Sequence, residues 1–356
     1  MSILWWNLLL AFGFSFLARY FAKPAGLTPY VKPNRLMVLC AMATLIFAAG
    51  MQSNIGDTFY YMHSYKTVDF HWQSIDYSGD FGFNLYQMGL QQFSSDPQIL
   101  ILVTALLTNL LIVSVLAGYS RLLEISVFVY ITSGMFITSM NGIRQYLAAA
   151  IVFTAIRFLI KGQFWRYLLV ILFAATIHKT ALILIPIYFI VRRRAWTWQT
   201  AAILLAAVAV VFGFNQFTSI LFSVIEDTQY AGYKTFSEGG ANVLRVVVDG
   251  APMIFAFLGR ERLRRDFTGG DVIVNMSLIG LVFMIIATQN WIFARFAIYF
   301  GLYQLILITW IFHVFRHKDK KLIYYGVLVF YFVFYFYENV ITLGLTYKSN
   351  WLPWLY

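Results

Sequence analysis

Three arginines lie near the start of long apolar segments, where a charged side chain is costly. These are Arg144, Arg245 and Arg295, and Lys179 stands at the turn between two further apolar segments. An arginine inside a membrane costs about 2.5–3.5 kcal/mol on insertion scales, so it normally faces a partner or a wet cavity. A guanidinium forms a planar fork of hydrogen bonds that suits the oxygens of a diphosphate. These cations are predicted to bind one diphosphate; the alternative is that each reaches lipid phosphates or pairs with an acid such as Asp249.

A histidine and an aspartate are the candidates for proton chemistry. His178 precedes Lys179, and Asp57 follows the second apolar segment in the run Gly56-Asp57-Thr58. An imidazole titrates near pH 6.5, so His178 can accept a proton at neutral pH, and nearby cations are expected to lower its pKa. Asp57 is either a helix cap or a carboxylate that serves as a general base or hydroxyl anchor. His178 is favoured slightly over Asp57 as the base.

Metal and cofactor chemistry have no support in the sequence. Cys40 is the single cysteine and lies inside an apolar segment, which excludes an intramolecular disulfide and a cysteine metal site. The remaining histidines show no spacing typical of metal ligands; they are His63, His71, His313 and His317. We therefore predict neither a metal nor a cofactor.

The composition indicates which kind of fold positions these residues. Hydrophobic residues make up 61% of the 356 residues and charged residues 12%, against about 25% charged in soluble domains. The net charge of +11 is spread over short basic clusters between apolar segments, a pattern of membrane topology and not of nucleic-acid binding. We predict an all-α, polytopic membrane bundle that forms one integral membrane domain over 1–356.

Apolar segments suggest about 12 membrane crossings. They lie at about 3–22, 36–52, 98–117, 125–140, 143–160, 164–178, 179–191, 200–217, 244–259, 271–289, 291–312 and 322–341. Most can cross about 30 Å of hydrocarbon at about 1.5 Å per residue. The short sixth and seventh segments form either one crossing or two. With two, most of the 26 basic residues fall on one side, which is then cytoplasmic.

This topology places both termini and two long loops outside the cell membrane. The loops, at 53–97 and 218–243, are rich in Tyr, Phe, Gly, Asp and Glu and are expected to form structure. They hold Tyr61, Asp80 and Tyr233, and the predicted site therefore faces outward.

Five short motifs resemble, in order, the EpsG family of exopolysaccharide and O-antigen polymerases, often grouped with the Wzy-type polymerases. The motifs are Gly56-Asp57-Thr58 with Tyr61, Asp80-Phe81-Gly82-Phe83, Gly142-Ile143-Arg144-Gln145, His178-Lys179-Thr180-Ala181-Leu182, and Ala294-Arg295-Phe296 with Tyr299-Phe300. Members often carry Glu where Asp80 stands and Ser where Thr180 stands, and both changes preserve the chemistry.

The resemblance implies a GT-C-type glycosyltransferase of the bacterial cytoplasmic (inner) membrane. Such an enzyme joins polyprenyl-diphosphate-linked oligosaccharides, which serve as donor and acceptor, beside membrane lipid. A chain-length regulator and a flippase are the implied protein partners. Substrate contacts are then implied for Tyr61, Asp80, Gln145, Tyr233 and Tyr299. The departing diphosphate is already a stabilised anion, so arginines can neutralise it in place of a metal.

Three other functions fit parts of the pattern. A flippase or exporter of the same lipids would carry charges through both leaflets and inverted repeats, whereas here the charges gather at the outer end. A glycan ligase shares every feature used above. An acyltransferase is less favoured, because the sequence has no His-x4-Asp motif.

Overall fold

The structure is a computed structural model and describes residues 1–24, 31–77, 79–224, 239–316 and 318–352. Within these ranges the regular secondary structure is helical apart from β1 (Lys23–Pro24) and β2 (Val31–Lys32), which pair antiparallel. The first helices are α1 (Ser2–Tyr20), α2 (Arg35–Gly50), α3 (Thr58–Thr67), α4 (Phe81–Gln91), α5 (Gln98–Tyr119), α6 (Leu123–Thr132), α7 (Met135–Asn141), α8 (Ile143–Thr154), α9 (Ile156–Lys161) and α10 (Phe164–Ile177). The others are η1 (Lys179–Ile183), α11 (Leu184–Val191), α12 (Trp198–Phe212), α13 (Phe214–Val224), α14 (Val243–Leu258), α15 (Arg260–Asp266), α16 (Gly270–Ala287), α17 (Ile292–Val314), α18 (Lys320–Tyr335) and η3 (Phe336–Thr342).

Every predicted apolar segment coincides with helix, so the all-helical membrane fold class is confirmed. Five helices of the described chain are long and apolar enough to cross a membrane: α1, α5, α16, α17, and α18 continued by η3. The pair α6 and α7, bent by 57°, makes a sixth candidate. The apolar helices α2, α8, α10, α12 and the stretch Lys179–Val191 are shorter. The number of about 12 crossings stays a prediction.

The bend between α6 and α7 depends on one glycine. Gly134 has a φ of +84°, in the left-handed region that side chains with a Cβ rarely adopt. A Cβ at this position would come into contact with the side chains of Glu338 and Arg245. The break therefore brings the backbone of the α6–α7 turn close to two charged groups inside the bundle.

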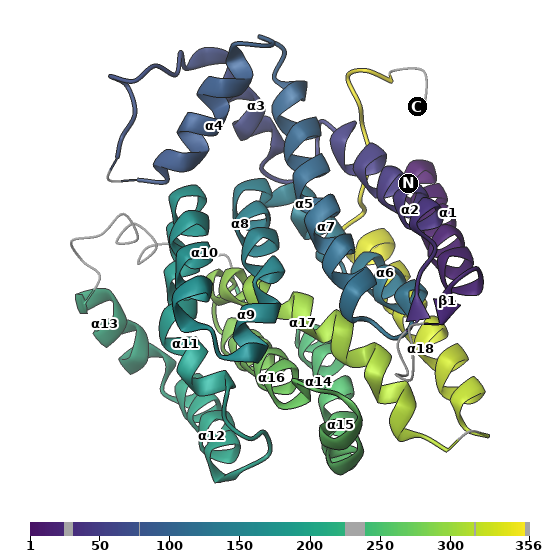
Figure 1. Cartoon of the computed structure of the whole chain (residues 1–356). Helices are drawn as coiled ribbons and strands as arrows, with labels where there is room; N and C mark the ends of the chain where they lie inside the picture. Colours follow the sequence, from purple (N-terminus) through teal and green to yellow (C-terminus); the bar gives the residue numbers. More distant parts are fainter. Residues whose placement is uncertain (25–30, 78, 225–238, 317, 353–356) are drawn as a thin grey trace.

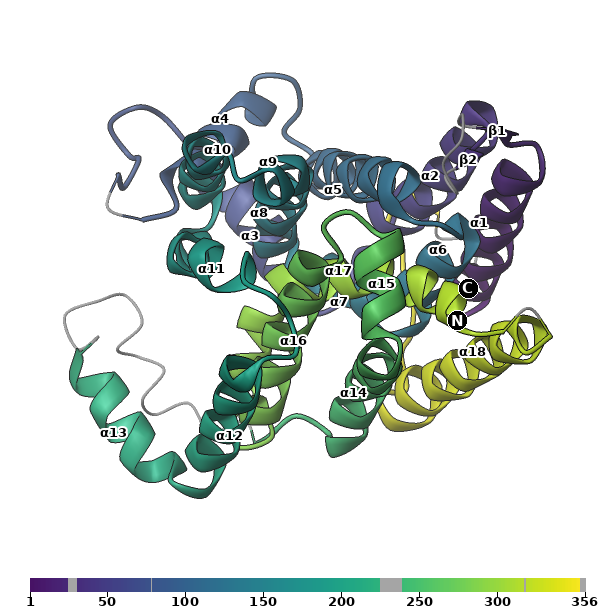
Figure 2. The same cartoon turned by 60° about the horizontal axis from the view of Figure 1, so that its bottom comes forward.

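Helix α17 forms the centre of the bundle and packs along α16. It also contacts α6, α8 and α14, so residues from distant parts of the sequence meet around it. At one end, the rings of Phe267 and Trp310 stack with centroids 4.2 Å apart. Helices α1 and α2 pair with each other at the side and pack on α6 and α5 respectively (Figure 2).

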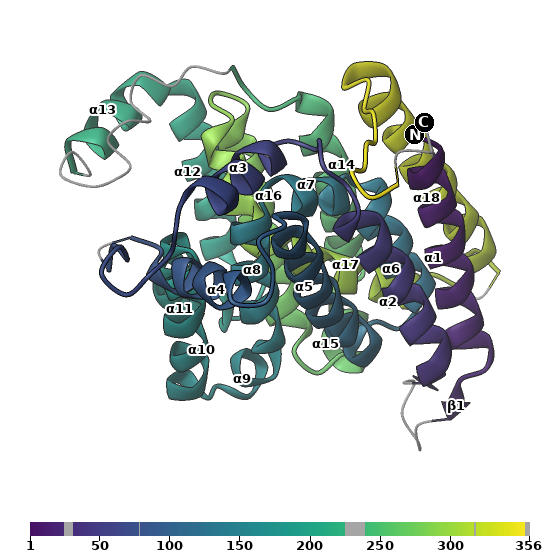
Figure 3. The ribbon, with the colours of Figure 1, turned by 90° about the horizontal axis from the view of Figure 1, so that it is seen from above.

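Two short helices cover one end of the bundle. Figure 1 shows α3 and α4 at the end opposite α15, and Figure 3 shows both on the near side of the bundle when it is seen from above. Both belong to the predicted loop 53–97, so this loop has structure, as expected. Helix α15 carries four arginines and no other basic residue: Arg260, Arg262, Arg264 and Arg265. The arginine-rich helix α15 and the loop 53–97 thus lie at opposite ends of the bundle, and the sidedness of the membrane stays a prediction.

Candidate functional site

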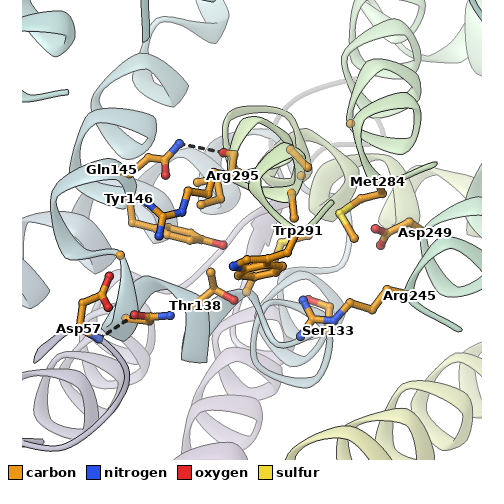
Figure 4. Close-up of a pocket in the computed structure, with 18 of the residues that line it drawn as sticks. Asp57, Ser133, Thr138, Gln145, Tyr146, Arg245, Asp249, Met284, Trp291 and Arg295 are labelled. Carbon is orange, nitrogen blue, oxygen red and sulfur yellow. Dashed lines mark hydrogen bonds between the residues drawn. The ribbon is translucent and has the colours of Figure 1, made fainter. Parts of the chain in front are cut away.

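A cavity of about 480 Å³ opens among α3, α7, α8, α14, α16 and α17 (Figure 4). This volume lies in the range of sites for small molecules, about 300–1,000 Å³. The predicted site residues that line it are Asp57, Tyr61, Arg144, Gln145, His178, Arg245 and Arg295. The structure thus brings together residues from five separate regions of the sequence.

The other predicted site residues are placed differently. Asp80 and the backbone of Lys179 lie directly behind His178, and the Lys179 side chain is not part of the cavity wall. Tyr299 is buried, and its hydroxyl shares a 2.9 Å hydrogen bond with Thr180 Oγ1. Tyr233 lies outside the described residues. The diphosphate-binding role of Lys179 and the substrate-binding roles of Asp80, Tyr299 and Tyr233 stay predictions.

Asp80 is held against His178 by the close packing of α4 on α10. Gly82 makes this approach possible, because a Cβ at position 82 would collide with the side chain and backbone of Thr176. The Asp80 carboxylate accepts hydrogen bonds from the Lys179 backbone N–H (2.9 Å) and from His178 Nδ1 (3.0 Å). It also forms an ion pair with Arg144 Nη1 at 3.2 Å. The motif around Asp80 therefore supports both the histidine and one arginine.

The hydrogen bond from His178 to Asp80 fixes how the imidazole is used. His178 has an extended backbone (φ −151°, ψ 111°) in the connection between α10 and η1. A neutral ring that donates from Nδ1 carries no proton on Nε2, so Nε2 is the nitrogen left to accept one. Asp80 thereby selects the tautomer that a general base requires.

The pKa values at this pair keep the aspartate charged and the histidine neutral. Burial alone would raise the pKa of Asp80, but the hydrogen bonds from His178 and Lys179 and the charge of Arg144 outweigh it and lower the pKa. Burial lowers the pKa of His178, Asp80 opposes this, and Arg144 and Arg295 add to the lowering. The predicted lowering for His178 is confirmed, with burial and not neighbouring charge as its largest cause.

Asp57 presents its carboxylate to the cavity because the preceding glycine fits tightly. Gly56 has a φ of +56°, and a Cβ there would collide with the side chain of Asn141. The Asp57 backbone N–H donates to Asn141 Oδ1 at 2.8 Å, which ties α3 to α7. Asp57 stands at the N-terminus of α3, but its side chain makes no capping hydrogen bond. Of the two predicted roles for this residue, helix capping is therefore wrong.

Gln145 uses its amide to position the neighbouring arginine segment. Its Nε2 donates to the Arg295 backbone carbonyl at 2.8 Å, as Figure 4 shows, and joins α8 to α17. Arg144 and Arg295 both act electrostatically on His178 and on Tyr61. These two arginines, His178, Tyr61 and Asp57 define what we call the histidine end of the cavity.

Arg245 lies at the other end of the same cavity. In Figure 4, Arg245 and Asp249 are separated from Arg295 by Trp291. The guanidinium of Arg245 forms an ion pair with Glu338 and none with Asp249, the partner that its sequence spacing suggested. Arg245, Asp249 and Glu338 define the carboxylate end. All three predicted arginines line this one cavity, with Arg245 apart from the two that lie with the histidine; their shared binding of one anion stays a prediction.

Glu338 is the residue of this region that the sequence analysis missed. Its side chain is 5% exposed and belongs to η3, a π-helical turn that continues α18. Acids inside membrane segments are rare, and π-turns often occur at functional sites. A glutamate within the last apolar segment was the signal that could have identified it.

No cluster of three or more His, Cys, Asp or Glu side chains suited to a metal is found in the described ranges. The family model of the EpsG family matches residues 35–355, which is nearly the whole chain. No curated protein and no solved structure matches the chain.

Proposed function

The chain belongs to the EpsG family, and from this membership we propose that it is a polysaccharide polymerase of the bacterial cytoplasmic membrane. The family and the apolar helices support a membrane protein of polysaccharide biosynthesis. The proposed reaction is glycosyl transfer between polyprenyl-diphosphate-linked oligosaccharides on the outer face of that membrane. The single observation that carries the proposal is the meeting of Arg144, Arg295 and a tautomer-fixed His178 in one cavity.

The histidine end contains the groups that this reaction needs. Arg144 and Arg295 are proposed to bind the donor diphosphate, whose negative charge grows as the bond to the sugar breaks. A hydroxyl oxygen of the acceptor forms the new bond to the anomeric carbon, and the diphosphate leaves with the electron pair of the old one. The hydroxyl proton passes to His178 Nε2. Asp80 stabilises the imidazolium that results, as its hydrogen bond to Nδ1 is already in place.

The test is purified protein with lipid-linked oligosaccharides extracted from cells that lack this chain. A ladder of lipid-linked products would support the polymerase, and Arg144→Ala is expected to give no ladder. Transfer of a single unit to an unrelated acceptor would instead establish a ligase. Movement of the extracted lipid across vesicles without new bonds would establish a flippase.

Sidedness needs its own experiment. With Cys40 replaced by serine, single cysteines at His63 and Arg193 are placed in the loop 53–97 and in a basic cluster. In intact cells an impermeant maleimide is expected to label the cysteine at position 63 and not that at 193. The reverse labelling would place the loop 53–97, and Asp57 with it, in the cytoplasm.

A further inference from the structure

The carboxylate end of the cavity has a charge balance that does not suit a diphosphate. Two acids, Asp249 and Glu338, interact electrostatically with a single arginine, Arg245. Glu338 already occupies the Arg245 guanidinium. An anion brought here would meet a cation that is already paired with an acid, so it would gain little attraction from binding.

Asp249 is the group at this end that is available to a ligand. Its side chain lines the cavity, is partly exposed, and accepts no hydrogen bond from any described residue. The backbone around it is held firmly, because Gln304 Nε2 donates to the Asp249 carbonyl at 2.9 Å. An inward-facing acid in a membrane bundle normally has a partner or a function. An ionised carboxyl group accepts hydrogen bonds and a protonated one can also donate, so a hydroxyl group, which does both, can be its partner in either state.

The surrounding side chains indicate which donor fits. Gln304 lines the cavity beside Asp249, and Trp291 lies between this end and the histidine end (Figure 4). A carboxylate, an amide and an aromatic face suit a neutral ring that bears several hydroxyl groups.

We propose that the carboxylate end is the subsite for a sugar of the acceptor glycan, with Asp249 accepting hydrogen bonds from its hydroxyl groups. Arg245 then has a positioning role: it neutralises Glu338 and keeps the second acid, Asp249, for the sugar. This assignment rests on the proposed polymerase function and divides its cavity into a diphosphate site and a glycan site. Trp291 lies where the acceptor would pass from one site to the other.

Two probes separate the sites. The first is the free glycan, which mild acid releases from the extracted lipid-linked oligosaccharide and which is then labelled at its reducing end. The second is farnesyl diphosphate, which carries the diphosphate and no sugar. Asp249→Asn is expected to weaken binding of the free glycan about 10- to 100-fold, since a charge-assisted hydrogen bond is lost, and to change farnesyl diphosphate binding less than about twofold. Arg144→Gln is expected to do the opposite.

The matched control is Asp319→Asn, which makes the same chemical change at the start of α18, where the side chain makes no capping bond. It is expected to bind both probes as the wild type does. Equal binding of the free glycan by Asp249→Asn and wild type would overturn the subsite, and so would an equal loss of both probes.

A second measurement uses the unmodified chain and so does not depend on how the variant folds. Asp249 is expected to react with a carbodiimide, as read by mass spectrometry, and to be protected by the free glycan and not by farnesyl diphosphate. Protection by farnesyl diphosphate instead would overturn the assignment. If wild-type protein forms no ladder while both experiments separate the probes, the polymerase fails and the glycan subsite stands. If a ladder forms and neither experiment separates the two probes, the polymerase stands and the glycan subsite fails.

Discussion

The two ends of the cavity place the same residue type in different surroundings. At the histidine end, Arg144 is 37% exposed and shares its Asp80 partner with His178. At the carboxylate end, Arg245 pairs with Glu338, whose side chain is 5% exposed, and a second acid lies next to the pair. Arg144 keeps hydrogen-bonding capacity that a ligand could use, whereas the guanidinium of Arg245 is already occupied by Glu338. The role of an arginine in this membrane bundle is therefore set by the acids around it.

The two ends also differ in how they are built. Asp57 and Asp80, which shape the histidine end, come from the loop 53–97 through α3 and α4. The carboxylate end is made by α14, α17 and η3. Changes in the loop should therefore act on proton chemistry and donor binding, and changes in α14 on the acceptor. This division makes the comparison testable, residue by residue.

The largest effect is expected for His178→Ala. Loss of a general base lowers turnover by about 10²- to 10⁴-fold. Because the His178 pKa is lowered, the wild-type rate should fall only at a pH below about 6.5, as Nε2 becomes protonated. The variant should lose this acidic limb of the pH–rate profile.

The control for this variant is His71→Ala, an exposed histidine of the same loop whose ring, among the described residues, bonds to the nearby Asp69 carbonyl. It should keep both the rate and the limb. A His178→Ala enzyme that also keeps both would shift the role of base to Asp57.

Lysine substitutions compare the two ends directly. Arg144→Lys and Arg295→Lys retain the charge and lose the planar fork, so farnesyl diphosphate binding and turnover should each fall about 10- to 100-fold. Arg245→Lys should leave farnesyl diphosphate binding within about twofold, since Arg245 faces Glu338. Equal losses for all three, measured by equilibrium binding, would restore the single three-arginine clamp that the sequence predicted.

Much of this arrangement could be predicted from the sequence, and the reason lies in local patterns. Apolar segment length predicts where helices form, and the cost of burying an arginine predicts that Arg144, Arg245 and Arg295 face a cavity. Which acid each arginine meets could not be predicted. Asp80 lies 98 positions before His178, and their contact depends on the packing of α4 against α10 at Gly82.

The pairing of Arg245 shows the same limit. Asp249, one helical turn away, was the partner that local spacing favoured. Glu338, which is 93 positions away, forms the ion pair, and both side chains lie beside Gly134 at the break between α6 and α7. Long-range pairings of this kind depend on tertiary packing, which single-sequence periodicity does not specify.

Asp80→Asn is expected to have an intermediate effect, about tenfold on turnover. The variant keeps the shape and loses the charge that stabilises the imidazolium. Because Asp80 raises the pKa of His178, its loss should move the acidic limb to lower pH, a shift that a purely structural role would not produce. Asp80→Glu should recover most activity.

The control for this change is Asp69→Asn, in the same loop and exposed, which should alter neither rate nor profile. A limb that moves to higher pH in Asp80→Asn, or does not move, would contradict the role of Asp80 in holding His178.

The smallest effect is expected for Asp57→Asn, and it decides between the two candidate bases. The Asp57 carboxylate lines the cavity and makes no hydrogen bond with a described residue, so asparagine should leave the fold intact. If Asp57 only accepts a hydrogen bond from a substrate hydroxyl, an amide oxygen replaces it in part, and KM should rise about three- to tenfold with kcat nearly unchanged. The acidic limb of the pH–rate profile, which protonation of His178 causes, should stay at the same pH as in the wild type. A loss of about 10²-fold or more in kcat, together with loss of that limb, would make Asp57 the base and leave His178 to position the acceptor.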